Sequence, residues 1–173
     1  MLPSPVQGTR PTAPSPVCFT AGAHLITLHA GRRGGPLTSA HLTSEFHAAV
    51  HLLALERWWR VRCAVLLPHR AHVVAALSPG TPPAAAAEEL KRRLVPCLRR
   101  AGRKWETGHH TRLIKQPAEL AEIFHGLFRE SRQAGLCAEG ESWTGYLCED
   151  DNRDLLGALR LASDPSGTSS HRT

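Results

Sequence analysis

The stretch from residue 61 to residue 77 constrains the fold most, because two short apolar runs flank a single proline. The runs are rich in valine, leucine and alanine, and Pro68 and His69 stand between them. Apolar runs this short, broken by a proline, favour two buried strands joined by a tight turn over one helix. His69 and His72 lie near the start of the second run, where a metal site or a site that supports a nucleophile is expected. The rest of the chain can be arranged around this strand pair.

Length and composition predict one domain with two irregular ends. A chain of 173 residues is large enough to bury a core. Residues 1–17 are rich in proline, serine and threonine, so we expect a disordered arm before a folded domain that spans 18–150. Residues 151–173 are expected to form a tail that is largely disordered.

The cysteines and the hydropathy pattern indicate where the protein resides. Five cysteines at wide separations form neither a disulfide framework nor a zinc motif, which indicates a reducing, cytoplasmic compartment. No run approaches the roughly 20 apolar residues of a membrane span. The first residues also lack the apolar block of a signal peptide. We therefore expect no membrane association and no export.

The charge balance indicates a class of partner. Lysine and arginine number 21 against 15 acidic residues, which gives a net charge of +6. Such an excess favours a polyanion such as nucleic acid, although a basic surface that is merely solvated has the same composition. Composition alone does not choose between these two interpretations.

Hydrophobic periodicity predicts the order of the elements. In chain order we expect a strand over 19–30, a helix from Thr43 or Ser44 to Glu56, the strand pair of 61–77, a helix over 84–101, a strand over 111–115 and a helix from Gln116–Pro117 to about 134–136. Gly126 is anomalous within the last helix, because an interior glycine costs about 1 kcal/mol relative to alanine. It is predicted to lie on the polar face, where no packing demand explains the missing side chain.

Several motifs occur in an order that resembles one known family. Leu67–Val74 resembles the family motif Met-Pro-Asp-His-Val-His-Leu-Leu, and residues 87–91 contain the Leu-Lys pair of a family helix. Residues 104–114 are similar to the motif Leu-Trp-Gln-x-Gly-Phe-x-Asp-x-x-Ile. Residues 133–136, followed by Trp143, resemble the motif Asn-Pro-Val-Arg-Ala-Gly-Leu with its downstream tryptophan. Over residues 19–146 the chain resembles the single-tyrosine transposases with an HUH fold, and among them the REP-associated tyrosine transposases. The resemblance implies an α+β fold, with a ferredoxin- or RRM-like central antiparallel sheet of four to five strands and helices packed on it.

The resemblance implies a metal site whose residues are altered here. In the family, two histidines separated by one residue hold a divalent metal, and residues i and i+2 of a strand do face the same side. The matching pair is Arg70 and His72. Arginine has no lone pair to offer a metal, and His69 is out of phase with His72 on a strand. His72 is therefore expected to be a remnant ligand, with Glu130 as a further candidate.

The family nucleophile is a helix tyrosine, and its position is also altered. Counted from the Ala-Gly-Leu match, that tyrosine falls at Gly126, with Glu130 one turn later. The only tyrosine of the chain is Tyr146, which we interpret as an aromatic cap beside Trp143 rather than as a relocated nucleophile. No catalytic residue is thus assigned, and the sequence leaves enzymatic activity open.

The leading hypothesis is a DNA-binding protein of this family that binds single-stranded or hairpin DNA and has lost or impaired strand cleavage. The expected nucleic-acid-binding residues are Arg32, Arg33, Arg70, Arg92, Arg93, Lys104, Arg112 and Lys115. No cofactor is expected for that role.

Two alternatives stay open. One is an active transposase, with Mg²⁺ or Mn²⁺ held by His72 together with His69, His125 or Glu130, and with Tyr146 or water as the nucleophile. The other is a scaffold for protein interaction. Members of the family often form homodimers, but no residue of this sequence identifies an interface.

Overall fold

A computed structural model gives the fold of residues 22–31, 33–138, 141 and 143–148. The described chain forms one five-stranded antiparallel sheet in the order β4-β1-β3-β2-β5, with helices on both faces. The elements are β1 (Ala23–His29), α1 (Ala40–Leu55), β2 (Trp59–Leu66), β3 (Arg70–Leu77), α2 (Pro83–Arg100), β4 (His110–Ile114), α3 (Pro117–Gln133) and β5 (Tyr146–Cys148). The expected α+β fold is confirmed. The predicted arm over 1–17, the tail over 151–173 and Arg32 lie outside the described residues.

The strand pair predicted from residues 61–77 forms the centre of the sheet. β2 and β3 are antiparallel, with Leu66 opposite Ala71, and the amide of Leu67 donates to the carbonyl of Arg70 at 2.8 Å. β1 pairs with the other edge of β3. The turn that contains Pro68 therefore brings the start of β3 to one end of the sheet.

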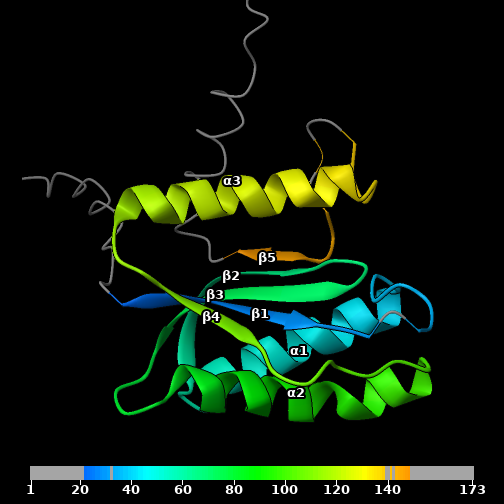
Figure 1. The fold of residues 1–173 in the computed structure, drawn as a ribbon, viewed down its shortest axis with the longest axis horizontal. Coiled ribbons are helices and arrows are strands. Elements are labelled where there is room, and N and C mark those ends of the chain that lie inside the picture. The colour runs from blue at the N-terminus through cyan, green and yellow to red at the C-terminus, as the bar shows by residue number, and fades with distance from the viewer. Residues whose placement is uncertain (1–21, 32, 139–140, 142, 149–173) are drawn as a thin grey trace, which may run out of the picture.

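Strand alternation divides the buried side chains between two cores, and Figure 1 shows the resulting three layers. One core lies under α1 and α2 and includes Ile26, Val73 and Phe46. The other lies under α3 and includes Val65, Val74 and Phe124. Because successive strand residues face opposite sides, β1, β2 and β3 each supply both cores.

Tryptophan side chains and the apolar face of α3 complete the two cores. Trp59 is buried, and its indole Nε1 donates to the carbonyl of Val50 at 3.2 Å, while Trp58 packs against the same core. The buried side of α3 consists of Leu120, Ile123, Phe124, Leu127 and Ser131, which recur at the helical period. Gly135 follows the helix at a φ of 69°, the left-handed conformation that glycine commonly adopts after a helix end.

Two element predictions need correction. α1 begins at Ala40 and not after Thr43 or Ser44, because Ser39 is the N-cap and its hydroxyl accepts from the amide of Leu42 at 3.3 Å. No pattern in the sequence predicts β5, because a strand of three residues is too short to show a period. Among the described residues, no helix is both long and apolar enough to cross a membrane.

Candidate functional site

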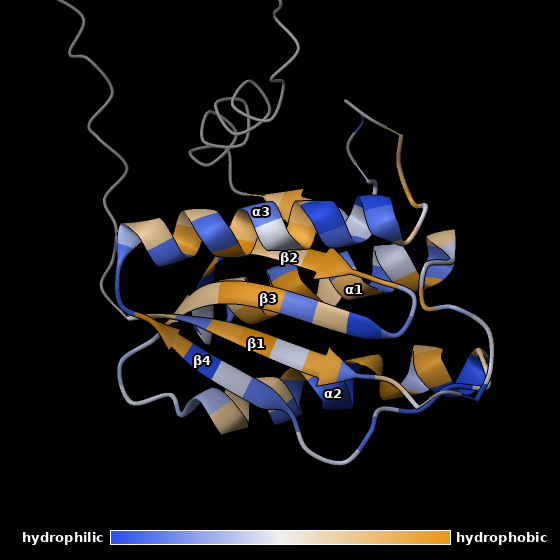
Figure 2. Cartoon of the chain, turned by 45° about the horizontal axis from the view of Figure 1, so that its top comes forward, coloured by the Kyte–Doolittle hydropathy of each residue, from blue (hydrophilic) through white to orange (hydrophobic). Residues whose placement is uncertain are grey.

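Three side chains from β3 and α3 meet at the end of the sheet beside the Pro68 turn. The Arg70 guanidinium lies 3.1 Å from the Glu130 carboxylate, and Nε2 of His72 lies 3.4 Å from the same Oε2. In Figure 2 the start of β3 is hydrophilic where the rest of the strand is hydrophobic. The structure thus brings together three of the residues predicted from the altered family motif.

Strand parity and the packing of α3 explain why these residues meet. Arg70 and His72 are two residues apart on β3 and therefore share the face that α3 covers. Apolar contacts hold α3 on this face, so its later turn places Glu130 above the start of β3. β1 completes the floor, with Thr27 opposite His72 and His29 opposite Arg70.

The side chains around Glu130 favour the ionised form of its carboxyl group. His72 is the largest cause of a lowered Glu130 pKa, with Arg70 and Arg129 adding to it against partial burial, so Glu130 is ionised at neutral pH. On the other side of the ring, Nδ1 of His72 lies 2.9 Å from the Thr27 hydroxyl. Within the described residues, Nε2 of His72 and Oε2 of Glu130 make no hydrogen bond. The two atoms therefore lie within ion-pair distance but outside hydrogen-bond geometry.

The cluster opens on solvent. A pocket of about 440 Å³ is lined by His29, Leu67, Pro68, His69, Arg70, Glu130 and Ala134. The Arg70 side chain is 41% exposed, whereas His72 is buried. The Arg70 guanidinium is therefore accessible from the pocket, whereas the His72 ring is covered.

Gly126 lies one helical turn before Glu130, so both residues occupy one side of α3. A Cβ atom built at Gly126 meets no heavy atom within 4 Å. The glycine is therefore not required by close packing, in agreement with the sequence interpretation.

The residues at this site do not fit a divalent metal of the kind the family uses. His72 and Glu130 offer lone pairs, but the third member of the cluster is a cation that already pairs with the carboxylate. His69 and His125 are both exposed. No group of three histidine, cysteine or acidic side chains with metal-binding geometry occurs in the described parts of the chain.

Tyr146 lies under α3 and away from the pocket. It stands opposite Val65 on β2, which in turn stands opposite His72, so one strand separates the two side chains. Burial raises the pKa of the Tyr146 hydroxyl far above its ordinary value, and the neighbouring thiols of Cys63 and Cys148 add to the effect. Its backbone amide donates to the carbonyl of Trp143 at 3.0 Å, so the tyrosine lies beside that tryptophan as predicted.

The other basic residues predicted to bind nucleic acid are distributed around the fold. Arg92 and Arg93 project from α2, on the opposite side of the sheet from α3, where carboxylates pair with them. Arg112 pairs with Glu119 at 3.0 Å. Arg33, Lys104 and Lys115 are exposed. None of these six described residues lines the pocket beside Arg70.

Sequence reasoning missed two polar residues of β1 at the site. Thr27 contacts His72, and the His29 ring lies edge-on to His110 with 5.6 Å between ring centroids. Partial burial lowers the pKa of His29, and the nearby His110 and Arg70 act in the same direction against the carboxylate of Glu106. The available signal was their alternation with Ile26 and Leu28, which marks a polar patch on one strand face.

Comparison with known proteins supports the fold. Neither a family model nor a curated protein sequence matches the chain. A REP-associated tyrosine transposase bound to a REP hairpin is similar in structure, with a TM-score of 0.56 and 14% identity over 66% of this chain and 69% of that chain. A candidate transposase from Deinococcus radiodurans R1 gives a TM-score of 0.46 and 10% identity over 68% of this chain and 98% of that chain. At 14% identity, the first likeness establishes a shared fold.

Proposed function

We propose that this protein binds DNA in single-stranded or hairpin form at the pocket beside Arg70, and that covalent strand cleavage is lost or impaired. A solved structure with the same fold is a REP-associated tyrosine transposase bound to a REP hairpin. A net charge of +6 suits a polyanionic partner.

The observation that carries the proposal is the exposed Arg70 guanidinium at the position where the family motif has a metal ligand. Its charge lies in an open pocket and is held by one carboxylate at 3.1 Å. A DNA phosphate is an alternative partner for the same guanidinium, through charge-assisted hydrogen bonds that are shorter and stronger than neutral ones. Arg70 would thus hold a phosphate electrostatically without activating it.

Two features support the loss or impairment of cleavage. The helix position that matches the family tyrosine is Gly126, which has no side chain to attack a phosphate. The Tyr146 phenol is largely buried under α3 with a raised pKa, so it is a poor nucleophile. Binding is therefore the part of the family chemistry that the remaining side chains favour.

Binding of hairpin, single-stranded and duplex DNA to the full chain at 50 and 200 mM salt tests the proposal. We expect hairpin and single strand to bind best, with affinity falling on the order of a hundredfold between the two salts if about four phosphates are contacted. Glu130→Gln should strengthen binding, because it removes the charge that competes for Arg70. Absence of salt-dependent binding to all three DNAs would contradict the proposal.

The active-transposase alternative also has an observation in its favour. Nε2 of His72 and Oε2 of Glu130 lie 3.4 Å apart without a hydrogen bond among the described residues, although Arg70 pairs with the same carboxylate oxygen and opposes a metal there. Incubation with hairpin DNA and Mn²⁺ or Mg²⁺, followed by denaturing electrophoresis, tests for a covalent adduct. An adduct that disappears in Tyr146→Phe would favour this alternative over the proposal.

A further inference from the structure

A second pocket lies on the other side of the sheet, between α2 and the segment that connects it to β4. It has a volume of about 410 Å³ and is remote in sequence from the Pro68 turn. Its cationic lining residues are Lys91, Arg92, Arg99, Arg103 and Lys104, against two acidic residues, Glu88 and Glu106. The excess of cations indicates an anionic ligand.

Arg103 is the buried cation of this pocket. It is only 3% exposed, and its Nη1 donates to the carbonyls of Arg33 at 3.3 Å and Gly34 at 3.1 Å. Its Nε and Nη2 atoms are buried with no hydrogen-bond partner in the described parts of the chain. Because an unpaired buried guanidinium is costly, these donors favour an acceptor that carries negative charge.

The loop that precedes α1 fixes the Arg103 side chain. A Cβ atom at Gly34 would lie 2.6 Å from Cδ of Arg103, and the φ of Gly34 is 97°. Only glycine accommodates both the close approach and this backbone conformation. The guanidinium is therefore held in place before any ligand arrives.

Trp105 and Lys91 have different roles in the pocket wall. The indole Nε1 of Trp105 is buried and, within the described residues, also lacks a hydrogen-bond acceptor. The Lys91 ammonium, by contrast, already contacts the Glu88 carboxylate at 3.1 Å and the carbonyls of Glu106 and Gly108. The unused donors of this wall thus belong to Arg103 and Trp105.

We propose that this pocket binds a phosphate group, with the Arg103 guanidinium and the Trp105 indole N–H as donors and with Arg99 and Lys104 as cations at the rim. A phosphate oxygen can accept from both Nε and Nη2 of one guanidinium, which suits the geometry of arginine. The phosphate comes either from a nucleic-acid backbone or from a free small molecule. The site is separate from the pocket at Arg70, so it does not depend on the proposed DNA function.

Titration of the full chain with inorganic phosphate, at constant ionic strength set with chloride, tests the site by calorimetry. We expect saturable binding to the wild-type chain that weakens at least tenfold in Arg103→Gln. Because Arg103 also holds the loop at Arg33 and Gly34, circular dichroism must confirm that this variant folds. The double variant Arg99→Gln, Lys104→Gln changes only exposed side chains, and it should weaken phosphate binding at least threefold whether or not Arg103→Gln folds.

Arg100→Gln is the matched control, because Arg100 is exposed on the same helix end and does not line the pocket. It should change phosphate affinity less than twofold. Lack of saturable phosphate binding to the wild-type chain would overturn the proposal. Equal affinity of the rim double variant and the wild-type chain would overturn it too, because the phosphate would then bind elsewhere.

Competition with a single-stranded oligonucleotide distinguishes the source of the phosphate. If the oligonucleotide displaces phosphate and its own affinity falls in the rim double variant, the pocket binds nucleic-acid backbone. If phosphate stays bound while the oligonucleotide does not compete, the pocket binds a free small phosphate. Both results support a phosphate site, and neither depends on whether DNA binds at Arg70.

Discussion

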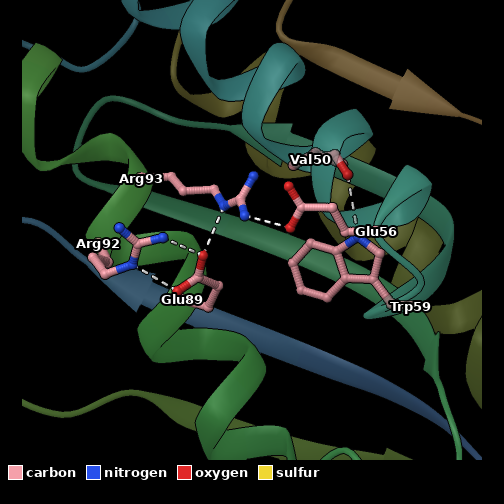
Figure 3. Close-up of polar contacts among 6 residues, drawn as sticks. All are labelled: Val50, Glu56, Trp59, Glu89, Arg92 and Arg93. Carbon is pink, nitrogen blue, oxygen red and sulfur yellow. Dashed lines mark hydrogen bonds and ion pairs between the residues drawn. The ribbon is translucent and has the colours of Figure 1, made fainter.

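Two ion-pair clusters lie on opposite sides of the sheet and differ in how their charges are matched. On the α1–α2 side, Arg93 contacts Glu56 and Glu89, and Arg92 contacts Glu89, at 2.5 to 2.8 Å (Figure 3). On the α3 side, one carboxylate, Glu130, faces both Arg70 and His72 at 3.1 and 3.4 Å. The first cluster pairs two cations with two anions, and the second leaves a cation at an open pocket.

This difference separates Arg93, which holds the fold, from Arg70, which is available to a ligand. The Arg92 side chain is 70% exposed and is held by Glu89 of its own helix. Arg93 joins the C-terminal end of α1 to α2, and its side chain is 18% exposed. The Arg70 side chain is more than twice as exposed and borders an open pocket. A basic residue in the sequence therefore counts toward DNA binding only when its carboxylate partners leave it accessible.

Arg70→Gln should produce the largest effect that separates the clusters. Loss of one charge-assisted phosphate contact is expected to weaken hairpin binding about tenfold. It should also reduce the slope of log affinity against log salt concentration by about one. Fluorescence anisotropy with labelled hairpin DNA measures both quantities. Arg93→Gln is the comparison variant and should change affinity less than twofold. Equal losses in the two variants would remove the distinction between the clusters.

Arg93→Gln should instead reduce stability. The substitution breaks two ion pairs and leaves Glu56 and Glu89 without their shared cation, so we expect a loss of about 1 kcal/mol in the free energy of unfolding. Urea denaturation followed by circular dichroism gives this value. Arg70→Gln should lower stability by less than half as much, and the opposite ranking would contradict the structural role assigned to Arg93.

Gly126→Ala should stabilise the chain by about 0.5 to 1 kcal/mol. The new methyl group meets no atom within 4 Å, and alanine is favoured over glycine in a helix interior. Thermal unfolding of the two proteins measures the difference. Gly135→Ala is the matched control and should destabilise, because the φ of 69° at that residue suits glycine. A destabilising Gly126→Ala would indicate that the site needs its empty space.

The smallest expected effect is the pH dependence of stability in the cluster of Arg92, Arg93, Glu56 and Glu89. The Arg92 guanidinium, followed by that of Arg93, lowers the pKa of Glu89 from 4.5 to about 2. The unfolded chain therefore binds a proton more readily, so the contribution of Glu89 is present above about pH 4.5 and is lost as pH falls toward 2. We expect the free energy of unfolding of the wild-type chain to exceed that of Glu89→Gln by about 0.5 kcal/mol at pH 6. A difference that stays constant down to pH 2 would contradict this assignment.

Local patterns predicted much of the fold and part of the site. The strand pair around Pro68, the buried side of α3 and the shared face of Arg70 and His72 follow from periodicity within single elements. Each depends on neighbours close in the chain, which a sequence pattern records directly.

Features that depend on distant contacts were not predicted. The run of basic residues within 91–104 is typical of a solvated helix face. In the structure, however, Lys91 is buried beneath carbonyls of the segment before β4, and Arg103 is covered by the loop at Arg33 and Gly34. The three residues of β5 join the sheet only because β2 offers a free edge. Periodicity within one helix or strand carries no information on such partners.

The open space at Gly126 makes the chemistry of this position independent of the packing of α3. Since the first atom of a side chain there would touch nothing, a mutation at this codon can change the chemistry offered to a ligand while the α3 core keeps its packing. A new side chain at this position therefore has little effect on folding. Chemical change at residue 126 is thus separable from the stability of the scaffold, whereas a change at Arg70 also alters its ion pair with Glu130.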